Sequence, residues 1–225
     1  MSDPTSSPRR RRRFTPLLLI AGVGSAIVLS LSMTNTFSAF TAAITNSVNN
    51  AATGTMILQE TSGATVCNSN DTAGVNSANT INTNAATCAT INKYGGSTTM
   101  VPSASNTTPT NTVVTAIAFK NTGTGAAGSF TLTPGTCAQT QNGAINGSAA
   151  DFCSKLQVRI VSGATSVYSG TAAGLTAPIT LPATLIPAPG GATVPFTVTV
   201  FVDATADNTY QGKTASQTLL WTLSS

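Results

Sequence analysis

The sequence predicts an all-β fold, an antiparallel β-sandwich, and three observations support this class. Apolar and polar residues alternate over several segments in the second half of the chain, which is the pattern of half-buried strands. Turn-forming residues are frequent, with 19 Gly and 11 Pro, and they separate these segments as they do in sandwiches. Beyond residue 39 no long segment has the periodicity of a stable amphipathic helix. The 225 residues suffice for one ordinary domain.

The beginning of the chain has the layout of a secretory signal peptide. Five consecutive arginines at residues 9–13 precede an apolar run at residues 16–33, and small residues follow. We expect a signal helix within residues 1–39 and cleavage between Ala39 and Phe40. A membrane anchor is the alternative, because the run is nearly long enough to span a bilayer. The glycines and serines in the run favour cleavage. A twin-arginine signal is a weak alternative, because any arginine run fits that pattern.

The chain that would remain after cleavage, residues 40–225, has no net charge. Ten basic residues less the five arginines leave five, and six acidic residues less Asp3 leave five. The basic character of the whole chain therefore belongs to the signal, and no nucleic-acid partner is expected. A neutral chain rich in Thr, Ser and Asn favours self-association, which suits an assembling surface or matrix protein. An inert secreted domain is the alternative.

The four cysteines indicate disulfide bonds, because an even number follows an export signal. Three pairings are possible, and we favour the two local ones, Cys67–Cys88 and Cys137–Cys153. In the chain-entropy picture each such loop stabilises the fold by about 3 kcal/mol. A zinc site is excluded, because the chain has no CxxC spacing and no histidine.

The expected elements follow in chain order after the signal. Residues 55–58 are a short strand, and residues 62–111 form a Cys-containing insertion rich in Asn and Thr. The insertion is either a long loop or contains short strands that periodicity does not place. Alternation or apolar content then predicts strands in six further segments: 112–123, 129–133, 156–163, 165–170, 192–204 and 215–223.

Two of these strands carry notable aromatic residues. Phe201 interrupts the polar face of its strand, and we expect it to contact a neighbour. Trp221, the only tryptophan, alternates with Leu219 and Leu223 on the face that we expect in the core.

Several stretches, taken in order, resemble a known family. "SAFTAAITNSVNNAATGTMILQE" follows the apolar run and "DATADNTYQGKTASQTLLWTLSS" ends the chain, with "FKNTGTGAAGSFTL" and "KLQVRIVSGATSVYSG" between them. Together they resemble the TasA/camelysin family, secreted β-proteins released by the W type of signal peptidase. The matching positions are Ala39, Phe40, residues 52–55, Asn208, Tyr210, Gln211 and Gly212. The insertion at residues 62–111 departs from the family pattern.

The resemblance implies a jelly-roll-like sandwich and a structural subunit of a bacterial cell-surface or biofilm matrix fibre. Fibre-forming members donate an N-terminal strand to the next subunit, which is β-augmentation. Here Phe40, Ile44 and Val48 would help to seat that strand. The expected partners are further copies of this chain, joined head to tail, and a signal peptidase during export. The expected location is extracellular, at the cell surface or in the matrix.

Enzymatic chemistry is not expected. Without histidine the chain has neither HExxH nor a Ser-His-Asp arrangement, so we expect no catalytic residue, metal or cofactor. Camelysin-type members have been labelled metallopeptidases, which leaves a protease as one alternative. Asp203 and Asp207 are weak calcium candidates, and a solvated turn is favoured over them. A second alternative is a module that binds matrix or wall polysaccharide through Tyr168, Tyr210 and Trp221, although core packing of these rings is favoured.

Overall fold

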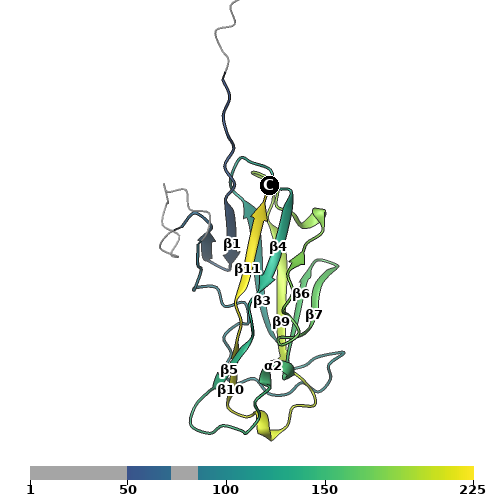
Figure 1. Cartoon of the computed structure of the whole chain (residues 1–225). Helices are drawn as coiled ribbons and strands as arrows, with labels where there is room; N and C mark the ends of the chain where they lie inside the picture. Colours follow the sequence, from purple (N-terminus) through teal and green to yellow (C-terminus); the bar gives the residue numbers. More distant parts are fainter. Residues whose placement is uncertain (1–49, 72–85) are drawn as a thin grey trace, which may run out of the picture. The chain divides into compact units, whose positions relative to one another are not determined.

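The computed structural model describes residues 50–71 and 86–225 (Figure 1). The chain divides into two units, Met1–Ala51 and Ala52–Ser225, and the second contains all the strands described. Several predictions fall outside the described residues: the signal peptide 1–39, the cleavage site at Ala39 and Phe40, and the donor residues Phe40, Ile44 and Val48.

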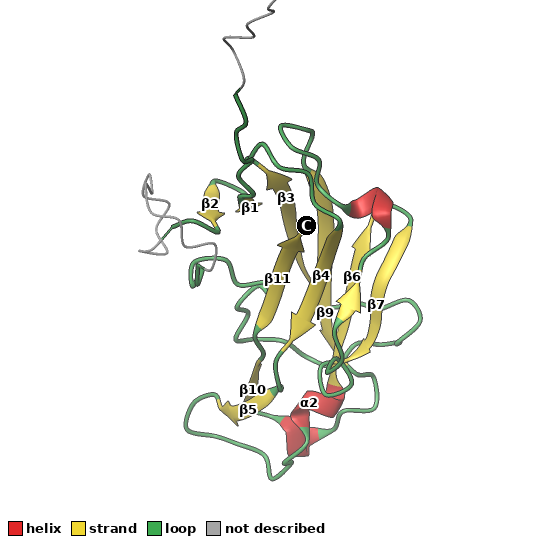
Figure 2. Cartoon of the chain, turned by 45° about the horizontal axis from the view of Figure 1, so that its top comes forward, coloured by secondary structure: helices red, strands yellow, loops and turns green. Residues whose placement is uncertain are grey.

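Two antiparallel sheets pack face to face in this unit, with β11 and β4 lying over β3 and β9 (Figure 2). The larger sheet has the order β2-β1-β3-β9-β6-β7, and its strands are β1 (Leu58–Ser62), β2 (Thr65–Asn68), β3 (Val113–Asn121), β6 (Leu156–Ser162), β7 (Thr165–Thr171) and β9 (Val194–Val202). The smaller sheet has the order β11-β4-β8, formed by β11 (Leu219–Ser224), β4 (Ser129–Pro134) and β8 (Ile179–Thr180). The predicted class, an all-β antiparallel sandwich, is confirmed.

The remaining elements are short. A two-stranded sheet pairs β5 (Ala138–Gln141) with β10 (Lys213–Ser216). The helical turns are α2 (Phe152–Lys155), η2 (Ala183–Leu185) and η3 (Asn208–Tyr210). No helix within the described ranges has the length and apolar character needed to cross a membrane.

The core between the sheets is built on four aromatic rings. Phe119 of β3 lies 5.2 Å from Phe130 of β4, 5.7 Å from Phe196 of β9 and 4.6 Å from Trp221 of β11, measured between ring centroids. All four residues are buried, so the prediction that Trp221 belongs to the core is confirmed. Leu219 and Leu223 lie partly buried against the same core.

The structure differs from the sequence at both ends of the predicted strand series. The predicted strand at residues 55–58 instead begins at Leu58, because the preceding backbone bonds to the β3–β4 loop: Thr122 N–H donates to the Ile57 carbonyl at 2.9 Å. The single closing strand is two strands, β10 and β11, which pair with β5 and β4. Gln217 and Thr218 separate them.

Phe201 has its contact within the chain. It is 1% exposed, and the guanidinium carbon of Arg159 lies 5.0 Å above its ring. The neighbour of Phe201 within the chain is therefore Arg159 of the adjacent strand β6, which makes a cation–π contact with the ring.

The cysteines form Cys67–Cys88 and Cys137–Cys153, the local pairing that the spacing favours. The first bridge joins Cys67 of β2 to Cys88, and both cysteines lie within the insertion at residues 62–111. The second joins the start of β5 to α2.

Candidate functional site

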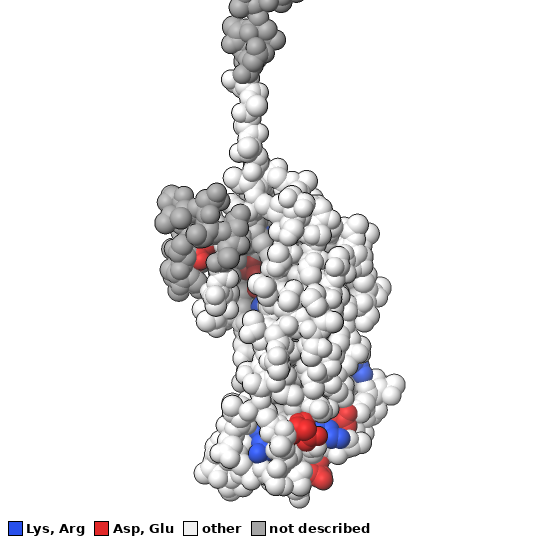
Figure 3. All heavy atoms as spheres, viewed as in Figure 1, with Lys and Arg blue, Asp and Glu red and all other residues white. Residues whose placement is uncertain are grey.

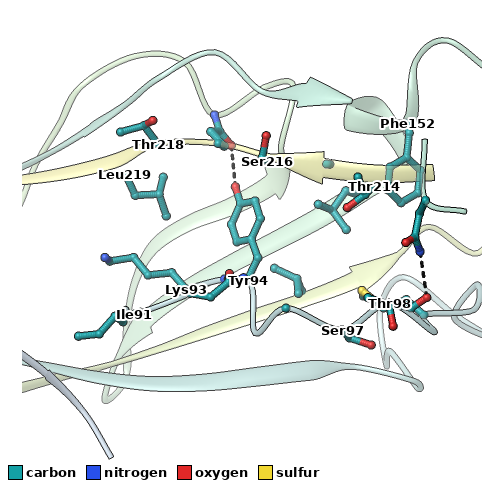
Figure 4. Close-up of a pocket in the computed structure, with 18 of the residues that line it drawn as sticks. Ile91, Lys93, Tyr94, Ser97, Thr98, Phe152, Thr214, Ser216, Thr218 and Leu219 are labelled. Atoms are coloured by element: carbon teal, nitrogen blue, oxygen red, sulfur yellow. Dashed lines mark hydrogen bonds between the residues drawn. The ribbon is translucent and has the colours of Figure 1, made fainter. Parts of the chain in front are cut away.

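A groove of about 1010 Å³ lies beside the last two strands. One wall is β10 and the first half of β11, and the opposite wall is the segment 86–102, called the strap below (Figure 4). Leu58 and Glu60 of β1 and Phe119 of β3 also line it. Its lining mixes apolar and uncharged polar side chains, as binding sites do.

The free edge of β11 faces this groove. Among the described residues β11 pairs only with β4, so its other edge presents unpaired backbone groups. Such an edge is a template for a further strand. Two apolar side chains at the groove are well exposed, Leu220 of β11 and Val101 of the strap, at 53% each.

The strap is anchored at its two ends. Cys88 is bonded to Cys67 of β2 near its start. At its end Pro102 forms a bridge with Val202, and Ser103 N–H donates to the Val202 carbonyl at 2.9 Å. Both anchors belong to the larger sheet, and the segment between them forms the wall of the groove opposite β10 and β11.

A tight turn in the strap points two side chains toward the groove. Gly95 N–H donates to the Asn92 carbonyl at 2.9 Å, and Gly95 and Gly96 have φ of 77° and 68°. Only glycine adopts this left-handed region freely, so the Gly-Gly pair fixes the turn. Lys93 and Tyr94 lie at its tip (Figure 4).

Lys93 forms an ion pair with Glu60 across the groove wall. Its Nζ lies 2.8 Å from Oε1 and donates to Oε2 at 3.1 Å, and each side chain is only 12% exposed. Glu60 lies directly opposite Phe119 in the pairing of β1 with β3, so it faces inward. Burial raises the pKa of Glu60 above 4.5, although the charge and hydrogen bond of Lys93 act to lower it.

Tyr94 spans the groove. Its hydroxyl donates to Gln217 Oε1 at 2.6 Å (Figure 4), and Gln217 Nε2 in turn donates to the carbonyls of Gly135 and Leu175 at 2.7 and 2.6 Å. Burial, with a smaller contribution from Tyr168, raises the pKa of the Tyr94 phenol, so this hydroxyl remains a neutral donor. The strap is thus tied to a side chain that the body of the sandwich holds in place.

The far end of the groove lies near α2. Phe152 and Tyr210 line it, and Asn142 Nδ2 donates to the strap carbonyl of Thr98 at 3.1 Å. The Tyr210 hydroxyl donates to Asp151 at 2.9 Å, and this bond raises the pKa of Tyr210. On the face shown in Figure 3 most charged side chains gather at this end, and most of the remaining surface is uncharged.

The chain enters the sandwich at the opposite end. The carbonyl of Thr55 accepts hydrogen bonds from Thr124 and Gly125 N–H at 2.8 and 2.7 Å. The end of β11 lies at the same loop, because Gly128 N–H donates to the Ser224 carbonyl at 2.8 Å. Thr55 therefore lies at the end of the unit opposite α2 (Figure 1).

The two aspartates proposed for calcium have separate roles. Burial alone would raise the pKa of Asp203, but its carboxylate accepts four hydrogen bonds that lower it, from Thr205 N–H and Oγ1, Gln157 and Asn106. It is buried, so the solvated-turn prediction is wrong for this residue. Asp207 is exposed and accepts from Thr209, which lowers its pKa. Within the described ranges no three His, Cys, Asp or Glu side chains gather to hold a metal ion.

The aromatic residues considered for polysaccharide binding do not form one strip. Trp221 is buried in the core and lines the groove, Tyr210 lies at the α2 end, and Tyr168 is half-buried outside the groove lining. The Tyr168 hydroxyl donates to the Thr171 carbonyl at 2.6 Å.

Sequence reasoning missed the side chains that shape the groove. Glu60, Lys93, Tyr94 and Gln217 come from β1, the strap and the β10–β11 junction. The one available signal was the Gly-Gly pair at residues 95 and 96, which indicates a tight turn. The turn-forming residues that are frequent throughout the insertion made this pair inconspicuous.

Comparison with models of protein families gives no match, and comparison with curated protein sequences gives none either.

Proposed function

We propose that the protein is an exported structural subunit of a bacterial cell-surface or matrix fibre, and that it has no enzymatic activity. The observation that carries the proposal is the free edge of β11 beside a ready-formed groove. An exposed edge with an adjacent apolar and polar cleft is the arrangement used in β-augmentation. The resemblance to the TasA/camelysin family and the two disulfide bonds are consistent with it.

The proposed occupant is the segment 40–50 of a second copy. It carries no charged residue, so it can enter a largely uncharged groove without desolvating a charge. Phe40, Ile44 and Val48 are spaced by four, and in a strand such residues all point to one face. These three side chains would face the groove while the backbone pairs with β11.

Trp221 gives this proposal a second support. Its indole N–H is buried and has no acceptor within the described part of the chain. An unpaired buried donor costs about 1–3 kcal/mol. An extended occupant brings a carbonyl oxygen with every residue, and it would relieve this cost if one of them reaches Nε1.

The positions of the two ends favour an open fibre. Thr55, near the start of the unit, lies at the β3–β4 loop, whereas the groove extends toward α2 at the other end. A neighbour's segment that enters from the α2 end would run antiparallel to β11. Such a contact joins different surfaces of the two copies, so it is heterologous and does not close into a dimer.

Electron microscopy of the exported protein tests the proposal. Deletion of residues 40–50, or the triple change Phe40→Ser, Ile44→Ser, Val48→Ser, should leave folded monomers without filaments. The matched control is the triple change to Ser at Thr41, Thr45 and Asn49, which alters the opposite face of the donor strand and should leave filaments intact. Filaments formed at the normal rate by the deletion variant would refute the proposal.

The second candidate is a monomeric module that binds matrix or wall polysaccharide. The uncharged polar side chains in the groove favour it, among them Asn142, Gln217 and Thr98. A monodisperse exported protein that sediments with purified wall glycans, and that forms no filaments, would support this function in place of the first.

A further inference from the structure

The strap is weakly joined to the sandwich between its anchors. In the described part of the chain, no hydrogen bond joins the backbone of residues 89–100 to the backbone of a strand. Four polar contacts between described residues hold this stretch to the rest of the unit: Thr90 with Cys67 Sγ, Lys93 with Glu60, Tyr94 with Gln217, and the Thr98 carbonyl with Asn142. Residues 95–99 are all exposed.

These features allow the strap to move without unfolding either sheet. Its anchors at Cys88 and Pro102 are held by a disulfide bond and a backbone bridge. Ile91, 8% exposed, is its main buried side chain. Segments with few buried contacts and few backbone hydrogen bonds open locally, at a lower free energy than global unfolding.

We propose that the strap is a gate over the β11 groove and that the hydrogen bond from Tyr94 to Gln217 is the clasp that keeps it closed. This inference rests on the proposed function, because the molecule that the gate admits is the 40–50 segment of a second copy. It assigns a role to the Cys-containing insertion, which the sequence alone leaves without one.

The position of the clasp explains why it must break. Tyr94 crosses from the strap to the β10–β11 junction (Figure 4). A strand that follows the free edge of β11 from the α2 end has to pass Gln217, where the phenol now lies. Gln217 cannot move aside easily, because its amide nitrogen is bound to two backbone carbonyls. The side chain that yields is therefore Tyr94, and the freed Oε1 of Gln217 can then accept an N–H from the incoming backbone.

Hydrogen exchange of the exported, unassembled protein tests the gate itself. The Trp221 indole N–H is buried without an acceptor among the described residues and lines the groove, so it should exchange through opening of the strap and faster than the amides of β3 and β9. Tyr94→Phe should accelerate its exchange about fivefold, the effect of losing one ordinary hydrogen bond. Tyr168→Phe is the matched control, because it removes an equally short bond outside the groove lining. A Trp221 indole N–H that exchanges only together with β3 and β9, or whose exchange Tyr94→Phe leaves unchanged, overturns the gate.

A binding measurement separates the gate from the proposed function. The probe is a synthetic peptide of residues 40–50, added to the full exported chain whose own donor is disabled by the three serine changes at Phe40, Ile44 and Val48. The emission of Trp221, the only tryptophan and a groove residue, reports binding. We expect Tyr94→Phe to raise the association rate about fivefold, and the Tyr168→Phe control to leave it unchanged.

The outcomes are distinct. Peptide that binds at the same rate with and without the Tyr94 hydroxyl overturns the gate and leaves the proposed function standing. Peptide that binds none of the variants overturns the proposed function, and the gate proposal with it. Asn142→Ala, which removes the contact to the Thr98 carbonyl, is a second variant that should also speed association; it keeps the test valid if Tyr94→Phe disturbs folding.

Discussion

Replacing Lys93 with Met should destabilise the protein in a strongly pH-dependent way. The change keeps a long apolar side chain but leaves Glu60 buried without its partner. Removing one member of a buried pair costs about 3–5 kcal/mol. Because both side chains retain 12% exposure, we take the lower end, about 3 kcal/mol at pH 7. For a unit of this size that corresponds to a fall in Tm of about 6–12 °C.

The pH dependence follows from the direction of the Glu60 shift. The pKa of this carboxyl is raised above 4.5 by burial, so over the window above 4.5 the folded state binds more protons than the unfolded state. Stability from this group is complete below 4.5 and is lost as the pH rises through the folded pKa. Lys93→Met removes the two influences that lower the pKa. The pH range over which the folded state binds more protons than the unfolded state therefore widens. At pH 4 the destabilisation caused by Lys93→Met should shrink to about 1 kcal/mol.

Urea unfolding followed by Trp221 emission, at pH 4 and pH 7 with the disulfide bonds intact, measures both values. The matched control is the double variant Glu60→Gln with Lys93→Met, which removes both charges and should therefore show little of this pH dependence. An equal destabilisation of Lys93→Met at the two pH values would refute the reasoning, because it would mean that Glu60 does not carry a buried charge at pH 7.

Three further changes test the packing that positions the groove. Asp203→Asn should lower the free energy of unfolding in urea by about 2 kcal/mol at pH 7. Because the folded-state pKa of Asp203 is lowered, the wild type loses the stabilisation from this carboxylate as the pH falls below 3.8. The stability difference between wild type and variant should therefore narrow at about pH 3. Gly123→Ala would place a Cβ 2.2 Å from the Thr55 carbonyl oxygen, and a fall in stability of about 2 kcal/mol should appear as a lower Tm. Phe119→Ala, at the centre of the aromatic core, should cost about 4 kcal/mol in urea unfolding.

The strands of the second half could be predicted because each one carries its own periodicity. Val198 and Val200 of β9, for example, alternate with threonines, and the structure buries both valines. This pattern is local, so one sequence is enough to read it. The closing segment shows the limit of the method. Its alternation runs on through Gln217, and nothing local reveals that β10 and β11 pair with two different strands.

The groove could not be predicted, because its walls are joined by contacts between distant residues. Glu60 and Lys93 are 33 positions apart, and Tyr94 and Gln217 are 123 positions apart. Neither pair has a spacing that a local rule can detect. Lys93 and Tyr94 also lie in a segment whose composition resembles that of a loop. That composition does not reveal that the fold places the segment opposite β11, where it lines the groove.

Glu60 connects the insertion to the groove by a physical requirement. Glu60 faces inward from β1, and a buried charge needs a partner of opposite sign. Neither β2 nor β3, the neighbours of β1, provides an ion-pair partner for it, and the strap does, through Lys93. The strap must therefore lie close to β1 whenever Glu60 is charged and buried. The pair thus favours the closed gate whenever Glu60 is charged, and an incoming strand has to compete with it as well as with the Tyr94 clasp.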